Sequence, residues 1–121
     1  RLAPFVDGAL DQCLTERLTP LAWSPLAGGL IGDGATKLLP AQKSYRLDTL
    51  LPELDGIAAA RGVSRTVIAL AWLMRHPSGI VPIVGSTKPE KIREGANAPR
   101  VELTREEWYR LLEAARGERL P

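Results

Sequence analysis

A short polar segment follows a run of β-branched residues in the second half of the chain, and its residue types suit phosphate binding. Residues 85–88 read Gly-Ser-Thr-Lys, and Lys91 follows about one helical turn later. Pro89 fits the first position of a helix, where its missing N–H is no loss, so Lys88 takes the N-cap position. Free backbone N–H groups at a helix N-terminus attract anions, and two hydroxyls with two ammonium groups would strengthen that attraction. The segment therefore predicts a phosphate site; the alternative is an ordinary polar turn with surface lysines.

An aromatic residue followed by a glycine-rich loop forms a second candidate segment. Residues 21–29 read Leu-Ala-Trp-Ser-Pro-Leu-Ala-Gly-Gly. Trp23, at the end of a predicted strand, offers a flat apolar face to a ring, and Ser24 with the N–H groups after it can hold a diphosphate. The alternative is that Trp23 is simply a core residue. Neither a Walker sequence nor a G-x-G-x-x-G motif occurs, which excludes P-loop and Rossmann nucleotide binding.

The basic residues are concentrated in one region. Residues 61–100 contain seven basic and two acidic side chains, whereas residues 1–60 contain five and seven. A local basic excess favours an anionic partner, either a phosphate-bearing cofactor or a nucleic acid. The alternative is a solvated basic face.

Four longer helices are predicted to frame these segments, over residues 8–17, 47–60, 64–76 and 104–117. Thr104 and Glu107 have the spacing of a capping box, which fixes the start of the last helix. The run 67–74 is apolar on every side, so its helix is expected to be buried. His76 falls in the last turn of that helix and is interpreted as a structural cap rather than a catalytic group.

Two short segments, 20–24 and 80–84, are predicted to be buried parallel strands. Pro82 argues against a central strand unless its missing N–H falls at an irregular or end position. Residues 27–45 show no periodicity and are predicted to form a long loop. Strands that alternate with helices indicate an α/β protein. Two strands, however, neither close a barrel nor cover the apolar faces of five helices, the four above and the one that begins at Pro89. The chain is therefore expected to be part of a larger sheet or barrel.

Composition limits the class of protein. With 121 residues, 45% hydrophobic and 25% charged, the chain is expected to form a globular core. A complete (β/α)8 barrel is excluded, because it needs about 250 residues. The single Cys13 and single histidine exclude a Cys/His zinc site from this chain alone, and a reducing, cytoplasmic compartment is expected. No stretch approaches 18 uncharged apolar residues, so no membrane span is predicted.

The segments 23–29 and 85–94, together with 103–109, resemble the last third of the aldo-keto reductases, and look closest to the bacterial branch of predicted oxidoreductases. The resemblance covers essentially the whole chain, residues 1–121, as one segment. It implies the C-terminal part of a (β/α)8 TIM barrel: about two β/α units and a C-terminal helix, not a complete barrel.

The resemblance also implies a role for each matching residue. Trp23 would stack on a nicotinamide ring, and Ser24, Leu26 and Gly28 would line the diphosphate. An adenosine 2′-phosphate would be surrounded by Ser86, Thr87, Lys88 and Lys91, which favours NADPH over NADH. Glu94 would lie near the adenine. Gly95 stands where the family often has Asn. The implied cofactor-binding residues are Trp23, Ser24, Pro25, Leu26, Gly28, Gly85, Ser86, Thr87, Lys88, Lys91 and Glu94.

The reaction implied by the resemblance is hydride transfer from NADPH to an aldehyde or ketone. The family's catalytic Tyr, Lys, His and Asp lie on earlier strands and loops, so no catalytic residue and no metal ligand is assigned here. We therefore expect the chain to be inactive alone and to need the preceding barrel segment or another chain, with no nucleic acid or membrane as partner. Two other hypotheses stay open: a noncatalytic, truncated interaction module, and nucleic-acid binding by residues 61–100.

Overall fold

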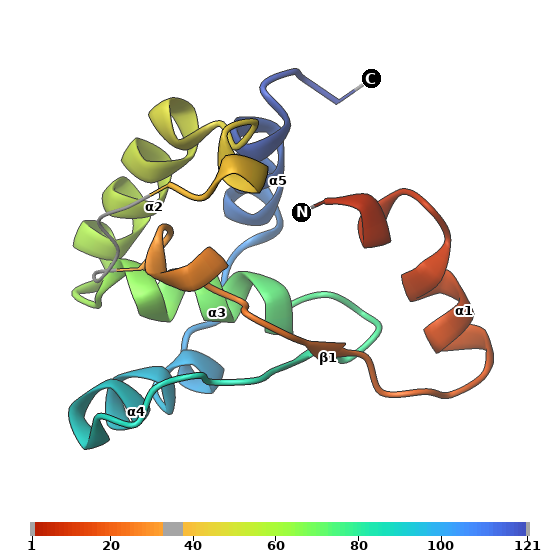
Figure 1. Ribbon diagram of the computed structural model, residues 1–121, viewed down its shortest axis with the longest axis horizontal. Coiled ribbons are helices and arrows are strands. Elements are labelled where there is room, and N and C mark those ends of the chain that lie inside the picture. Colours follow the sequence, from red (N-terminus) through yellow and green to blue (C-terminus); the bar gives the residue numbers. More distant parts are fainter. Residues whose placement is uncertain (1, 33–37, 121) are drawn as a thin grey trace.

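The predicted order of helices and strands is confirmed by the computed structural model, which describes residues 2–32 and 38–120 (Figure 1). Residues 33–37 of the predicted long loop lie outside the described residues. The elements are α1 (Ala9–Thr15), β1 (Leu21–Ala22), α2 (Leu47–Arg61), α3 (Arg65–Met74), β2 (Val81–Pro82), α4 (Pro89–Gly95) and α5 (Arg105–Arg116). Short 3-10 turns lie between them: η1 (Ala3–Phe5), η2 (Ala27–Gly29), η3 (Pro40–Gln42) and η4 (Ala98–Arg100).

The two strands pair in parallel, as predicted, with Leu21 opposite Val81 and Ala22 opposite Pro82. The N–H of Val81 donates to the Pro20 carbonyl and that of Ile83 to the Ala22 carbonyl, both at 3.0 Å. In a parallel strand, alternate residues bond to the same neighbouring strand. Val81 and Ile83 bond to the segment of β1, so the missing N–H of Pro82 faces the opposite edge of β2. Within the described residues no strand pairs with that edge, which is why the proline is tolerated.

The prediction that both strands are buried is wrong. Only two residues of each predicted segment form ladder positions, and the side chains of Leu21 and Val81 are 63% and 46% exposed. In the described residues the sheet contains two strands, so both outer edges stay unpaired and much of the strand surface meets water.

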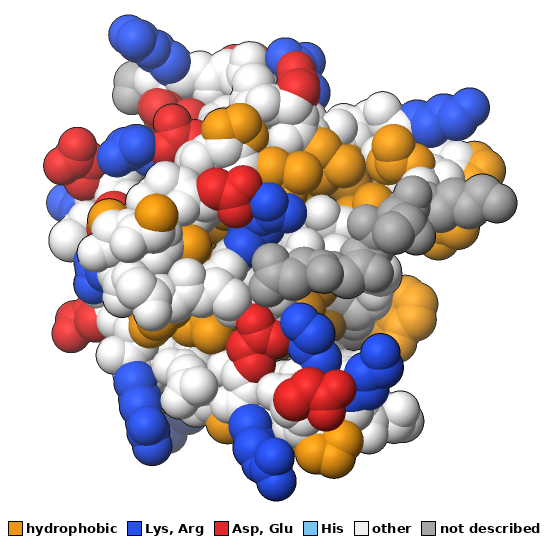
Figure 2. Space-filling view, turned by 90° about the vertical axis from the view of Figure 1, so that its left-hand side faces the viewer, with side chains coloured by type: hydrophobic (Ala, Val, Ile, Leu, Met, Phe, Trp, Pro, Cys, Tyr) orange, Lys and Arg blue, Asp and Glu red, His pale blue; other side chains and the backbone are white. Residues whose placement is uncertain are grey.

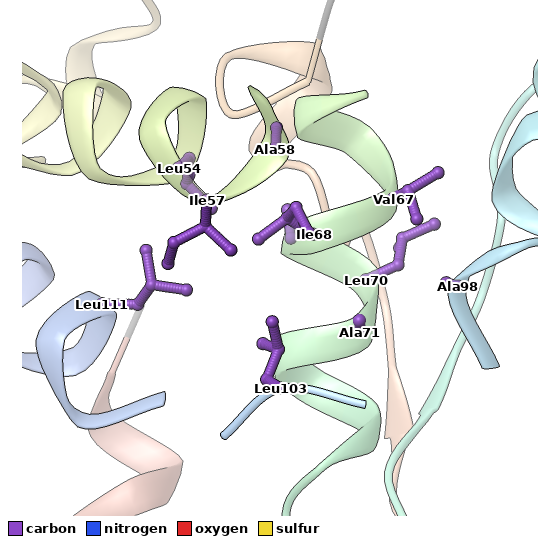
Figure 3. Packing of buried hydrophobic residues seen from close by; sticks show 11 residues of the cluster. Leu54, Ile57, Ala58, Val67, Ile68, Leu70, Ala71, Ala98, Leu103 and Leu111 are labelled. Atoms are coloured by element: carbon purple, nitrogen blue, oxygen red, sulfur yellow. The ribbon is translucent and has the colours of Figure 1, made fainter. Parts of the chain in front are cut away.

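The core lies between α2, α3 and α5. Figure 3 shows Ile68 of α3 pointing toward Ile57 of α2, with Leu111 of α5 on the same side. The fully buried side chains of this cluster include Ile68, Leu103 and Leu111. The predicted burial of the apolar helix is confirmed for the first two turns of α3, whereas Met74 near its end is 37% exposed.

Side-chain caps and left-handed glycines bound the helices as predicted. Thr104 Oγ1 accepts from the Glu107 N–H at 3.1 Å, and the Glu107 carboxylate accepts from the Thr104 N–H at 2.8 Å. Gly62 and Gly117 end α2 and α5 with φ of 64° and 77°. One detail differs: Pro52, expected to be tolerated only near the first turn, is the sixth residue of α2. There it removes a hydrogen bond from the interior of the helix.

Among the described residues, no single helix is long and apolar enough to cross a membrane. In the described part of the chain, α2 and α3 taken together have the length and composition of a span, but a bend of 98° separates them.

Candidate functional site

The register of the sheet brings the two chemistry-bearing segments to one edge. Because Ala22 lies opposite Pro82, the chain leaves both strands at the same level, about 4.8 Å apart. In Figure 1 both strands run toward the left; the segment after β1 turns up to η2, and that after β2 continues down to α4. Figure 2 views this side and shows Lys and Arg side chains, interspersed with Asp and Glu, across its lower part.

Trp23 opens the segment after β1, and it is 85% exposed. The alternative that Trp23 is a core residue is therefore wrong, and both faces of the indole are largely open to a planar group. Ser24 follows with a φ of 50°, and its Oγ accepts from the Gly28 N–H at 3.2 Å. A hydroxyl that accepts a hydrogen bond keeps its own hydrogen, so Ser24 can still donate to a ligand.

Most backbone donors of this loop are already used. The N–H of Ala27 donates to the Ser24 carbonyl and that of Gly29 to the Leu26 carbonyl, both at 2.9 Å. The Leu26 N–H has no acceptor among the described residues. Among the described residues, the donors of residues 24–29 that stay open to an anion are thus fewer than the sequence suggested: the Ser24 hydroxyl and the amides of Ser24 and Leu26.

The segment after β2 presents more free donors. Lys88 is the N-cap of α4 and Pro89 its first residue, as predicted, and the Lys88 N–H donates to Ser86 Oγ at 3.2 Å. The amides of Gly85, Ser86 and Thr87 find no acceptor among the described residues. Helix α4 has seven residues, so its dipole is small, and the attraction for an anion rests on these amides and on the lysines.

The two charged residues of α4 that were assigned to the site pair with each other. Lys91 Nζ lies 3.1 Å from Glu94 Oε2, and both side chains are partly buried. Lys88 makes no ion pair with a described residue. An anion at this segment would therefore meet one unshared ammonium and one shared with Glu94.

Gly95, the departure from the family's sequence pattern, lies where α4 packs on α3. It is buried, and a Cβ at this position would lie 3.4 Å from Leu70 and 3.8 Å from Val84, both ordinary van der Waals distances. A longer side chain such as that of Asn would have to turn away from these two residues. The packing therefore accommodates a methyl group and does not by itself require glycine.

An aromatic cluster that the sequence analysis did not anticipate lies elsewhere. The rings of Trp72 and Trp108 stack with centroids 4.9 Å apart, and each indole N–H donates to the other residue's carbonyl, at 2.9 and 3.0 Å. Of this pair, Trp108 borders an apolar pocket of about 420 Å³, together with Phe5 and Tyr109. None of the implied cofactor-binding residues lines it.

His76 borders the same pocket, and its bonds are structural. It lies one residue beyond the C-cap Arg75, and its Nδ1 accepts from the Ser78 N–H at 3.2 Å rather than capping the helix carbonyls as predicted. Burial lowers the pKa of His76 below its ordinary value, with Asp11 acting weakly in the opposite direction. Among the described residues no three His, Cys, Asp or Glu side chains gather as metal ligands.

Gln42 is the residue of the site region that sequence analysis missed. It is 8% exposed, and its side chain joins two parts of the long loop by hydrogen bonds to Ala27 and Leu39. A local signal was present: Gln three residues after the N-cap position, as in a capping box. The contact with Ala27 spans 15 residues, and no short-range pattern indicates it.

The chain is similar to known proteins over nearly its whole length. The chain is 49% identical over 121 residues to a 6-dehydroglucose reductase of Novosphingobium aromaticivorans, covering 100% of this chain and 37% of that protein. It is 38% identical over 120 residues to the oxidoreductase YcsN of Bacillus subtilis, covering 99% and 38%. The chain thus spans little more than a third of the length of the curated relatives it matches.

A solved structure has the same fold. The thermostable aldo-keto reductase Tm1743, in complex with the inhibitor epalrestat, superposes with a TM-score of 0.72 at 29% identity, covering 94% of this chain and 36% of that one. The fold is therefore that of a part of a (β/α)8 barrel, with a small open sheet. A model of the aldo/keto reductase family matches residues 7–116, which contain both segments at the edge of the sheet, and the chain belongs to that family.

Proposed function

We propose that this chain forms part of the NADPH-binding cleft of an aldo-keto reductase. The observation that carries the proposal is the strand register: two segments of different chemistry, one aromatic and one cationic, leave the sheet at the same edge. A dinucleotide has the same two-part character, because an aromatic nicotinamide lies at one end and phosphates lie along the rest. Family membership supports the choice of this cofactor over other anions.

Each segment takes one part of the cofactor. Trp23 stacks on the nicotinamide ring, and Ser24, Pro25, Leu26 and Gly28 border the diphosphate. Gly85, Ser86 and Thr87 supply amide and hydroxyl donors to the adenosine 2′-phosphate, with Lys88 and Lys91 as its counterions. Glu94 lies toward the adenine and holds Lys91 in place through their ion pair.

The reaction we propose for the whole protein is reduction of an aldehyde or ketone, for which bound NADPH supplies the hydride. The residues of this chain bind and orient the cofactor, and none of them acts as the proton donor, so the chain alone is inactive. Two relatives are named 6-dehydroglucose reductases, which makes an oxidised sugar the first substrate to test. NADPH and the free thiol of Cys13 both suit the cytoplasm, which we propose as its compartment.

Calorimetric titration of the chain with NADPH and NADH tests the cofactor assignment. We expect NADPH to bind at least tenfold more tightly than NADH, because the 2′-phosphate adds charge-assisted bonds worth about 1.5 kcal/mol or more. The double variant Lys88→Ala/Lys91→Ala should lose this preference. The control Arg93→Ala/Arg100→Ala removes the same net charge from exposed positions and should keep it. Equal affinity for NADPH and NADH in the unsubstituted chain would contradict the assignment.

A chimera tests the catalytic part of the proposal. This chain replaces the matching third of the Novosphingobium reductase, and reduction of 6-dehydroglucose is followed by NADPH absorbance. We expect turnover by the chimera and none by the chain alone. Carbonyl reduction by the isolated chain would show that its own residues supply the proton donor, against the proposal.

A noncatalytic interaction module remains the second candidate, favoured by the exposed apolar side chains on the strands. Leu21, Val81 and Ile83 are 63%, 46% and 42% exposed, a surface that suits another protein chain. Light scattering separates the two: a defined assembly that does not bind NADPH would favour the interaction module over the reductase.

A further inference from the structure

We propose that Gln42 is a positioning residue that holds the loop after β1 in the shape that receives the cofactor diphosphate. The inference rests on the proposed NADPH-binding function and extends it to a residue outside both binding segments. Gln42 is one of two glutamines in the chain, and it is the buried one; Gln12 on α1 is exposed.

Both ends of the Gln42 amide are bonded to backbone. Its Nε2 donates to the Ala27 carbonyl at 2.8 Å, and its Oε1 accepts from the Leu39 N–H at 2.8 Å. A carbonyl only accepts and an N–H only donates, so these partners fix the orientation of the amide. Gln42 therefore ties η2, directly after the Trp-Ser segment, to η3 at the other end of the long loop.

The loop needs such a tie because its backbone is unfavourable. Ser24 and Ala27 have φ of 50° and 53°, in the left-handed region that residues with a Cβ rarely adopt. Such conformations persist only where the surroundings hold them. The bond from Gln42 is to Ala27 itself, and the following Gly28 and Gly29 also have positive φ.

A second anchor holds the chain at Gly32, just after η2. A Cβ on Gly32 would lie 3.0 Å from Thr66 Oγ1, and Arg65 Nη1 lies 3.4 Å from the Gly32 carbonyl. Asp55 fixes the Arg65 guanidinium through two bonds of 2.7 Å, and this pairing lowers the pKa of Asp55. With Gly32 anchored on α3, the Gln42 bond determines the path between Ser24 and Gly29.

Loss of the Gln42 bond to Ala27 should therefore weaken the binding of one part of the cofactor, the diphosphate. Ser24 Oγ bonds to the Gly28 N–H within the held loop, and the open Leu26 amide precedes Ala27. Among the described residues, the side chain of Gln42 bonds to Ala27 and Leu39 and not to the segment 85–91. The geometry thus predicts weaker binding of the diphosphate with unchanged binding of the 2′-phosphate.

The test compares two ligands on the 121-residue chain, by calorimetry. NADPH reaches both segments, whereas adenosine 2′-monophosphate lacks the diphosphate and the nicotinamide, and reaches only residues 85–91. Gln42→Glu keeps an acceptor for the Leu39 N–H but turns a carboxylate oxygen toward the Ala27 carbonyl; Gln42→Ala removes both bonds. Gln12→Ala is the matched control at an exposed position.

We expect both Gln42 variants to bind NADPH about tenfold more weakly than the unsubstituted chain does, and to bind adenosine 2′-monophosphate within twofold of its affinity. Hydrogen exchange of residues 24–32, measured by mass spectrometry without ligand, should be faster in both variants and unchanged in Gln12→Ala. An equal loss of affinity for both ligands would indicate general destabilisation and overturn the inference. So would NADPH affinity that survives in both variants, or exchange that does not change.

The outcome for the unsubstituted chain separates this inference from the proposed function. If the chain binds neither ligand, the NADPH proposal fails, and the role of Gln42 in cofactor binding fails with it. If the chain binds NADPH and the Gln42 variants bind it equally well, the proposed function stands and the inference about Gln42 alone is wrong.

Discussion

The helical core and the sheet edge of this molecule differ in how they are stabilised. In the core, α2, α3 and α5 bury one another's apolar faces, and Ile68 at its centre is fully buried. At the edge, β1 and β2 pair over two residues, and Trp23 beside them is 85% exposed. Stability is concentrated in the helices, whereas the residues with binding chemistry lie where little packing holds them. The loop conformation there depends on a few specific bonds.

Truncation of core and strand side chains should give the largest contrast. Ile68→Ala should lower the free energy of unfolding by about 3–4 kcal/mol, because it leaves a cavity among rigid helices. Leu21→Ala, at a side chain that is 63% exposed, should cost less than about 0.5 kcal/mol. Urea unfolding followed by circular dichroism measures both. Equal losses would show that the sheet is as tightly packed as the core.

Two glycine substitutions test whether the loop is held against α3. Gly32→Ala should destabilise by about 1 kcal/mol, because the new Cβ would lie only 3.0 Å from Thr66 Oγ1 and 3.3 Å from Leu26 Cδ1, so these side chains would have to shift. Gly56→Ala in α2 has open space and should stabilise by up to about 1 kcal/mol through helix propensity. Thermal unfolding of the two variants measures the difference. A tolerated Gly32→Ala would mean that the loop does not pack there.

The capping box of α5 gives a smaller effect that depends on pH. Burial raises the pKa of Glu107, but bonds from Thr104 and Arg61 outweigh it, so the pKa lies below the ordinary value. A carboxylate with a lowered pKa stabilises fully above its unfolded pKa, and this contribution is lost as pH falls through the folded pKa.

Glu107→Gln should therefore cost about 1 kcal/mol at pH 7, and this cost should shrink as the pH falls below the ordinary glutamate pKa of 4.5. The exposed neighbour Glu106→Gln serves as the control and should change stability by less than about 0.5 kcal/mol at pH 7 and at pH 3. A constant cost of Glu107→Gln from pH 7 to pH 3 would rule out the contribution of its charge.

Trp23→Ala should have the smallest effect on stability and a large effect on binding. An indole that is 85% exposed contributes little burial, so we expect the melting temperature to stay within about 1 °C. NADPH affinity should fall severalfold through lost stacking, and the quenching of Trp23 fluorescence by NADPH should disappear. A large drop in melting temperature would show that Trp23 packs in the core after all.

Local chemistry explains what could be predicted from the sequence. Ser64 and Thr104 begin α3 and α5, and Gly117 ends α5, through contacts within a few residues; all three were recognised. The parallel pairing was also predicted, because strands separated by helices favour it. The two candidate segments were placed at strand ends, where the register brings them together.

The features that were missed depend on contacts between residues that are far apart in the sequence. The Gln42 bond to Ala27 and the Trp72–Trp108 pair join residues 15 and 36 positions apart. Burial of the strands was overestimated. A run of apolar residues indicates that a strand suits an apolar environment, but it does not show whether neighbouring strands are present to bury it. The role of each cofactor-binding residue stays a prediction.

Chemical-shift mapping by two-dimensional NMR tests the central claim most directly. The chain, labelled with ¹⁵N, is titrated with NADPH, and the backbone amides of both segments are followed. We expect residues 23–28 and 85–91 to shift together with one affinity, while amides around the Phe5 and Trp108 pocket stay in place. Shifts confined to one segment, or centred on that pocket, would contradict a cofactor site built from both strand ends.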